Sequence, residues 1–246
     1  IINLAALEKL LANNQPTLVS VMLANNETGV IQPIREVSQV TKKYGALLHC
    51  DAAQALGKIP VDFGTLDCDL MTLAAHKCGG PVGAAALVVR RDLAIQPLLT
   101  GGRQEMGRRA GTENVAAIAG FGAAAEAVRG NLSANAARMS ALLERIEAAI
   151  TAATPDAVVF GVSAPRLPNT TLVAVPGIKA ETALIAFDLN GIAVSSGSAC
   201  SSGKVAASHV LAAMGVEPVL ARGALRISLG PETSENEVES LLVAWK

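Results

Sequence analysis

The sequence predicts an α/β protein with a mostly parallel sheet, followed by a smaller α+β part. Short apolar runs alternate with helical segments as far as about residue 90, which is typical of strand–helix–strand units. These runs are apolar on both of their faces, as expected for strands that helices cover from two sides. After Pro155 the pattern changes to shorter strands and helices, which indicates a second architecture.

The elements of the first part follow in order along the chain. Apolar residues at helical spacing predict the first helix, which has to end before Pro16. Pro33 precedes the second helix, and continuous apolar runs predict the strands. The expected elements are a helix over 4–13, a strand over 17–23, a helix over 34–44, and strands over 46–51, 70–73 and 84–90.

An Ala-rich region over 114–151 connects the two parts, and it predicts two helices joined near Gly130-Asn131. We therefore divide the chain into residues 1–130 and residues 131–246. In the second part we expect strands over 158–160, 169–175 and 225–229, helices over 180–190 and 208–214, and a helix at the end of the chain.

Composition and charge argue against several classes of protein. The chain has 246 residues with 51% apolar side chains, enough for one large domain or two modest ones. A net charge of −1 without a basic stripe argues against nucleic acid as a partner. The apolar runs are far shorter than a membrane span, and no signal-peptide pattern is present, so we expect no membrane partner.

The cysteines indicate the compartment. Cys50, Cys68, Cys78 and Cys200 show neither CxxC spacing nor a disulfide framework, so a cytoplasmic location is the simplest interpretation. The first three stand in or beside strands, where we expect them to fill the core. His49 next to Cys50 could suggest a metal site, but no second pair stands at ligand spacing, and we expect no metal.

Cys200 stands apart from the other three. It lies in Ser196–Gly203, a Gly/Ser segment that offers no apolar neighbour to bury it. An accessible thiol of this kind can form a thiolate and act as a nucleophile. An inert loop cysteine is the plainer alternative.

Lys77 is a second candidate for a reacting residue. His76-Lys77 follows the apolar run 69–75 and precedes the glycine-rich turn 79–83. Such a lysine is a candidate Schiff-base residue, because a desolvated amine loses its proton more readily; a surface lysine at a turn is the alternative. Together with an accessible thiol it suggests pyridoxal phosphate chemistry on a sulfur compound. Asn26, Asp51 and Lys77 all follow strand ends, so they can converge on one cleft.

Six motifs, in order over the whole chain, carry a family resemblance. They are Asn25–Gly29, His49–Gln54, His76-Lys77, Gly107–Thr112, Ser195–Cys200 and Leu225–Gly230. One motif alone would be weak, but the six together resemble the group I cysteine desulfurases (NifS/IscS-like), which are fold-type I pyridoxal phosphate enzymes. The resemblance implies a partial cofactor-binding large domain in residues 1–130 and a small C-terminal domain with the cysteine loop in 131–246.

The resemblance also implies roles for the cofactor residues. Lys77 matches the lysine that forms the Schiff base and moves the α-proton of the substrate. Asp51 matches the carboxylate that pairs with the pyridinium nitrogen, and Gln54 matches the side chain bonded to the phenolic oxygen. His76 matches the histidine beside the lysine, near the cofactor phosphate. Thr112 matches a threonine that a dimer partner donates to that phosphate.

The substrate residues follow in the same way. Asn26, which also belongs to the implied cofactor set, and Arg226 match the pair that holds the substrate carboxylate, for which the two-pronged guanidinium is suited. Cys200 matches the cysteine that attacks the substrate sulfur and carries the persulfide.

The chain departs from the family at two places. Ala74 stands where the family has a serine that binds the cofactor phosphate. Family members also have an N-terminal segment, which holds a Gly-Thr phosphate turn and a ring-stacking histidine, and this chain lacks it. Because the chain begins Ile1-Ile2-Asn3 without methionine, we expect a truncated or cleaved desulfurase.

The implied activity is conversion of L-cysteine to L-alanine, with the persulfide sulfur passed to an acceptor such as an iron–sulfur scaffold. A homodimer is implied as well. Two alternatives stay open: another fold-type I enzyme, such as a selenocysteine lyase or an aminotransferase, and a fragment without catalysis that acts only as a binding module.

Overall fold

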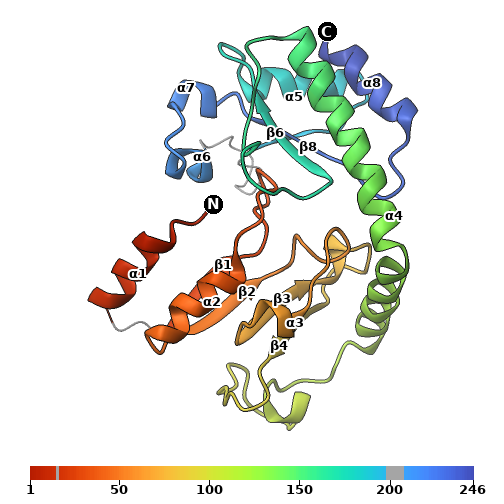
Figure 1. The fold of residues 1–246 in the computed structure, drawn as a ribbon. Coiled ribbons are helices and arrows are strands. Elements are labelled where there is room, and N and C mark those ends of the chain that lie inside the picture. The colour runs from red at the N-terminus through yellow and green to blue at the C-terminus, as the bar shows by residue number, and fades with distance from the viewer. Residues whose placement is uncertain (15–16, 198–207) are drawn as a thin grey trace. The chain divides into compact units, whose positions relative to one another are not determined.

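The computed structural model describes residues 1–14, 17–197 and 208–246, which form two compact units (Figure 1). The first unit comprises Ile1–Leu23 and Gln32–Leu132, and the second comprises Ala24–Ile31 and Ser133–Lys246. We predicted a single boundary between residues 130 and 131. The structure differs in that residues 24–31 belong to the second unit. That grouping has a physical reason, because backbone hydrogen bonds of 2.8 Å join Ile31 N to Pro165 O and Leu167 N to Gly29 O.

The first unit is built on a four-stranded sheet with the order β1-β2-β3-β4. The strands are β1 (Leu18–Met22), β2 (Leu47–Asp51), β3 (Leu70–Ala74) and β4 (Ala85–Val89). β1, β2 and β3 run parallel, and β4 runs antiparallel to β3, so the prediction of a largely parallel α/β sheet is confirmed. The edge strands β1 and β4 contain no fully buried residue, since an edge strand has a neighbour on one side only.

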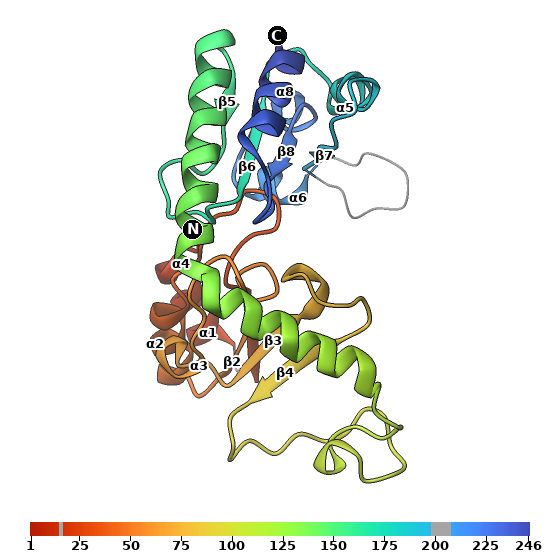
Figure 2. The same cartoon turned by 90° about the vertical axis from the view of Figure 1, so that its right-hand side faces the viewer.

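Three helices accompany these strands: α1 (Leu4–Asn13), α2 (Ile34–Lys43) and α3 (Phe63–Leu66). Figure 2 shows α2 and α3 next to each other on one side of the sheet. Asn3 caps α1 by accepting a hydrogen bond of 3.0 Å from Ala6 N. The sequence did not predict α3, a single turn whose N-cap is Asp62, because one turn is too short to show helical periodicity.

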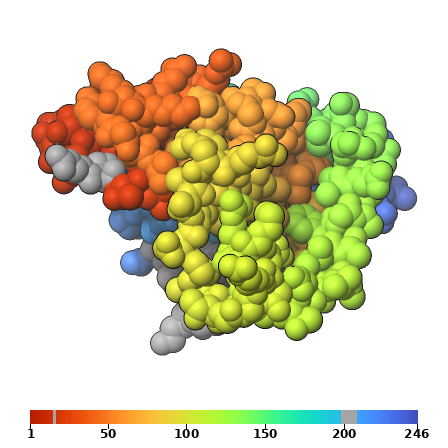
Figure 3. Space-filling model, turned by 90° about the horizontal axis from the view of Figure 1, so that it is seen from below, coloured from red at the N-terminus to blue at the C-terminus, as the bar shows by residue number. Residues whose placement is uncertain are grey.

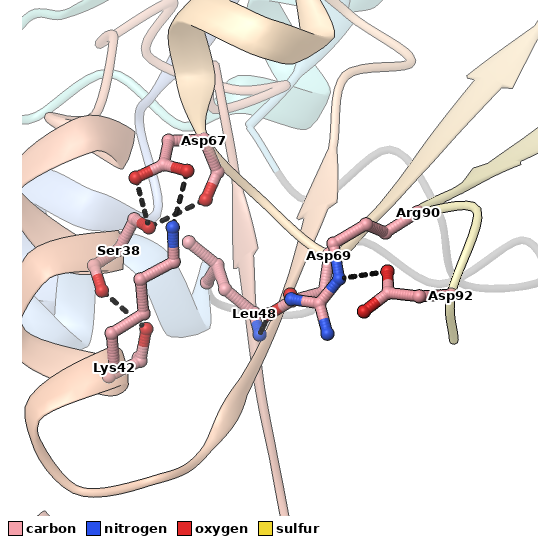
Figure 4. A network of polar contacts seen from close by, with 8 residues as sticks. Ser38, Lys42, Leu48, Asp67, Asp69, Arg90 and Asp92 are labelled. Carbon is pink, nitrogen blue, oxygen red and sulfur yellow. Dashed lines mark hydrogen bonds and ion pairs between the residues drawn. The ribbon is translucent and has the colours of Figure 1, made fainter. Parts of the chain in front are cut away.

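A polar network fixes the ends of β3 and β4 that lie away from Lys77 (Figure 4). Asp69 precedes β3 and is buried; its Oδ2 accepts a hydrogen bond of 2.7 Å from Leu48 N, and its Oδ1 pairs with Arg90. Arg90 Nε also donates to Asp92 at 2.7 Å. Nearby, Ser38 and Lys42 of α2 both bind Asp67. These contacts fix β3 relative to β2 and α2.

Helix α4 (Val115–Ala153) is one helix of 39 residues. The prediction of two helices joined near Gly130-Asn131 was wrong. A glycine costs a helix interior only about 1 kcal/mol, and the surrounding Ala, Glu, Leu and Arg residues favour helix strongly. Asn131 also donates back to Ala127 O at 3.4 Å, within the helix. Among the described residues, no helix is long and apolar enough to cross a membrane.

The second unit holds an antiparallel sheet with the order β5-β6-β8-β7. Its strands are β5 (Val158–Val159), β6 (Thr170–Ala174), β7 (Ser195–Ser196) and β8 (Leu225–Ser228). Its further helices are α5 (Ala180–Leu189), α6 (His209–Ala213), α7 (Pro218–Ala221) and α8 (Glu235–Trp245). The second unit is therefore α+β, as predicted.

The core of the second unit has two layers, one on each side of β6. All five residues of β6 are buried, and successive side chains face opposite sides of the sheet. One layer packs α4, α5 and α8 against Val173, and it contains Met139, Leu142, Leu143, Ile146, Ile150, Phe187, Val238 and Leu241. The other layer contains Phe160, Leu172, Ala174, Leu211, Ala221 and Ala224.

Candidate active site

In the first unit, two candidate residues come from the carboxyl ends of neighbouring parallel strands, where α/β sheets bind ligands. Asp51 is the last residue of β2, and its register partner on β3 is Thr72. Asp51 is half-buried; its Oδ1 accepts a hydrogen bond of 3.0 Å from Ala53 N, and Oδ2 has no partner among the described residues. Gln54 lies half-buried in the turn that follows. One carboxylate oxygen of Asp51 is therefore available for a ligand.

Lys77 ends a short 3₁₀ turn, η1 (Ala75–Lys77), that continues directly from β3. The turn is tight: the Ala75 carbonyl accepts hydrogen bonds from Cys78 N at 3.0 Å and Gly80 N at 2.9 Å. A Cβ at Gly80 would stand 3.1 Å from this carbonyl oxygen, which explains the glycine. His76 and Lys77 are exposed, so the Lys77 amine is accessible. β3 is less buried than the apolar run suggested, with Met71 its only fully buried residue.

Lys58 lies beside Lys77 and was not singled out from the sequence. Its Nζ donates a hydrogen bond of 2.9 Å to the carbonyl O of Lys77. The pKa of Lys58 is lowered to about 8, chiefly by burial; Cys78 opposes the shift, and the nearby charge of Lys77 adds to it. No local pattern marks this lysine, because its contact spans 19 residues of sequence.

Thr112 is exposed in the segment before α4, and no described residue forms a hydrogen bond with its side chain. Ala74, the last residue of β3, has no donor for a phosphate group. The expected convergence of Asn26 with Asp51 and Lys77 stays a prediction, because Asn26 belongs to the second unit.

In the second unit, Arg226 stands on the inner strand β8, with Leu172 and Ser195 as register partners. One terminal nitrogen of its guanidinium donates to the backbone O of Asn26 at 3.0 Å. This contact joins residues 200 positions apart. Arg226 Nε is buried and has no hydrogen-bond partner among the described residues. A buried donor without a partner is costly, so an acceptor such as a carboxylate fits this site.

The segment around Asn26 is held by its neighbour Asn25. Asn25 Oδ1 accepts hydrogen bonds from Glu27 N and Thr28 N, both at 2.9 Å. Gly29 adopts φ +72°, and a Cβ there would stand 3.0 Å from Thr170 O. The turn therefore needs both the Asx contact and the glycine.

The cysteines fall into two groups. Cys50, Cys68 and Cys78 are buried and free, as expected for core positions. The neighbouring Cys68 thiol and burial raise the pKa of Cys50, so Cys50 is a poor nucleophile. Cys200, the predicted nucleophile, lies outside the described residues.

The profile of the aminotransferase class-V family matches residues 1–241. The chain belongs to this family. A cysteine desulfurase of Klebsiella pneumoniae is 45% identical over 222 residues, which are 90% of this chain and 56% of that protein. The cysteine desulfurase NifS of Azotobacter vinelandii is 42% identical over 232 residues, 94% of this chain and 58% of that protein.

The fold agrees with this membership. The X-ray structure of a NifS-like protein from Rickettsia africae matches with a TM-score of 0.90 and 41% identity over 99% of this chain and 65% of that one. The fold is thus that of the fold-type I enzymes. The chain spans less than two thirds of the length of these relatives.

Members of the class-V family depend on pyridoxal phosphate, and the residues of the first unit fit this cofactor. Asp51 offers one oxygen without a described partner to a protonated ring nitrogen. Lys77 offers an accessible amine at the end of a hydrogen-bonded turn, as a covalent attachment to an aldehyde needs. The weak point is the phosphate, for which Ala74 provides no hydroxyl.

Proposed function

We propose that this chain carries the reacting residues of a pyridoxal phosphate-dependent cysteine desulfurase, which converts L-cysteine to L-alanine and keeps the sulfur as a persulfide on Cys200. The observation that supports it most is the buried Nε of Arg226, which has no hydrogen-bond partner among the described residues, although the same guanidinium binds the Asn26 carbonyl. This donor matches the α-carboxylate that every amino-acid substrate carries.

Different residues of the chain would bind the cofactor, bind the substrate and transfer the proton. When bound, pyridoxal phosphate supplies an electron-accepting ring that makes the α-proton of an amino acid acidic. Asp51 would keep the ring nitrogen protonated through Oδ2, and Gln54 and His76 would orient the cofactor. Lys77 would hold the cofactor, and its amine would serve as the base that takes the α-proton of the substrate. Asn26 and Arg226 orient the substrate carboxylate.

Cys200 then acts as the nucleophile. Its thiolate forms an S–S bond to the substrate sulfur while the substrate C–S bond breaks. The electron pair of that bond stays with the carbon fragment, which takes a proton and leaves as L-alanine. The sulfur remains on the enzyme for an acceptor protein, such as an iron–sulfur scaffold. The three buried free cysteines fit a reducing compartment, and we place the protein in the cytoplasm.

A homodimer is part of the proposal. Large apolar side chains are exposed near Thr112, with Leu98 at 95% and Met106 at 87%. Figure 3 shows this stretch, yellow to yellow-green, at the surface of the first unit. Exposed apolar groups of this size are typical of interaction surfaces, and a second copy would bring Thr112 to a partner's cofactor.

The experiment measures L-alanine formed from L-cysteine by the protein at its natural length, with pyridoxal phosphate. Cys200→Ala should reduce the rate by a factor of about 10³ or more, as loss of a nucleophile does. Cys78→Ala, at a buried free cysteine, is the matched control and should keep the activity of the parent.

L-Selenocysteine separates the alternatives. If Cys200→Ala still forms alanine from L-selenocysteine as fast as the parent does, the protein is a selenocysteine lyase. Transfer of the amino group to a keto acid without loss of sulfur would instead identify an aminotransferase.

A further inference from the structure

Glu27 lies next to Asn26 in the chain but has no role in the proposed function. Its side chain is buried, with 3% of the residue exposed. Its Oε2 accepts a hydrogen bond of 2.5 Å from the hydroxyl of Ser208, which is 2% exposed. Because burial of a carboxylate is costly, this contact must hold Glu27 and Ser208 together firmly.

Ser208 is more than a hydrogen-bond donor. It is the N-cap of α6, where its Oγ accepts a hydrogen bond of 3.0 Å from Leu211 N. Leu211 is fully buried in the core of the second unit. Glu27 is therefore attached, through Ser208, to the residue at which the chain enters α6.

The same carboxylate also stands against Gly197. A Cβ built on Gly197 would lie 3.2 Å from Glu27 Oε2, so the carboxylate fills the space that a side chain would need. Gly197 follows β7, and its N donates to Ala224 O at 3.0 Å. Oε2 of Glu27 thus accepts a hydrogen bond from Ser208, which follows residues 198–207, and occupies the space beside Gly197, which precedes them.

We infer that Glu27 is a positioning residue that fixes the two flanks, Gly197 and Ser208, of the segment that carries Cys200. The inference rests on the proposed function, in which Cys200 is the nucleophile. Two neighbouring residues would then position the two reactants. The Asn26 carbonyl binds Arg226, which is proposed to hold the substrate carboxylate. The Glu27 carboxylate binds Ser208, at one flank of the segment that carries the thiol.

The test compares Glu27→Ala and Glu27→Gln with Glu217→Ala, a control at an exposed glutamate that forms no side-chain cap in the same unit. The first readout needs no activity: it is the rate at which trypsin cuts after Lys204, inside the segment. Loss of a charge-assisted hydrogen bond should raise this rate about tenfold in Glu27→Ala. Glu27→Gln keeps an acceptor for Ser208 and should give a cleavage rate close to that of the parent.

The second readout is chemical, and it separates positioning from folding. In Glu27→Ala the cofactor absorption should be unchanged and the affinity for L-cysteine should stay within about twofold, whereas the rate of persulfide formation should fall by about tenfold to a hundredfold, as misplaced reacting atoms require. If Glu27→Ala does not fold, Ser208→Ala is tested in its place with the same two readouts.

Unchanged trypsin cleavage in a folded Glu27→Ala would overturn the inference. Equal losses of L-cysteine affinity and persulfide rate would also overturn it, since Glu27 would then act through Asn26. A parent protein that makes no persulfide refutes the proposed function instead, and the trypsin readout still decides the role of Glu27.

Discussion

Lys58, a lysine with a lowered pKa, lies next to the turn that carries Lys77. Its Nζ binds the Lys77 carbonyl, and burial lowers its pKa to about 8 from an ordinary 10.5. Between these two values the folded protein binds fewer protons than the unfolded chain, so stability should rise with pH in this window. The contribution is unfavourable below about pH 8, where the buried amine is charged.

The measurement is the free energy of unfolding by urea, for the parent and for Lys58→Met, across this window. We expect the parent to gain stability relative to Lys58→Met from about pH 8 to about pH 10.5. Lys9→Met, at an exposed lysine of α1, should show no such trend. A parent-to-variant difference that is constant with pH would show that Lys58 titrates normally.

Ala74 offers a second prediction at a single side chain. The family's serine at this position donates a hydroxyl to the cofactor phosphate, and a hydrogen bond to a charged group contributes roughly 1.5–3 kcal/mol. Ala74→Ser should therefore tighten pyridoxal phosphate binding about tenfold or more. Titration by visible absorption measures it, with Ala85→Ser, the exposed register partner on β4, as the control. Equal dissociation constants for Ala74→Ser and the parent would show that the phosphate lies elsewhere.

The strands of the first unit depend on Asp69 for their alignment. Its carboxylate binds Leu48 N of β2 and pairs with Arg90 at the end of β4. Asp69→Asn removes the charge from a buried group and should lower the free energy of unfolding by about 1.5–3 kcal/mol. Asp92→Asn removes a charge from an exposed partner of the same arginine and should cost at most about 1 kcal/mol. Equal losses of unfolding free energy in the two variants would show that burial of Asp69 does not strengthen its contacts.

Elements with a strong local pattern were predictable, and elements held by distant contacts were not. The apolar runs located β1 to β4 because each strand holds several consecutive apolar residues. β7 has two residues, and its pairing with β8 defines it, so no local signal exists. Gly130 suggested a break in α4, but a single glycine costs less than its neighbours contribute.

The candidate site was predictable only in part, for the same reason. Pyridoxal phosphate chemistry on a sulfur compound could be predicted from three residues. Asp51 and Lys77 follow predicted strands, and Cys200 lies on a Gly/Ser segment. The contact between Arg226 and Asn26 spans 200 residues, and the contact between Ser208 and Glu27 spans 181. Such pairs leave no trace in local spacing; the family resemblance indicated the first as a functional pair and did not indicate the second.

The central claim of the proposed function is that the amine of Lys77 and the thiol of Cys200 act in one reaction. The most direct test adds L-cysteine and pyridoxal phosphate to the protein at its natural length and then maps the cysteines by mass spectrometry. We expect one added sulfur atom on Cys200 in the parent and none in Lys77→Ala, because the C–S bond breaks only after Lys77 has removed the α-proton. Equal sulfur on Cys200 in Lys77→Ala, or sulfur on Cys50, Cys68 or Cys78 in place of Cys200, would contradict the account.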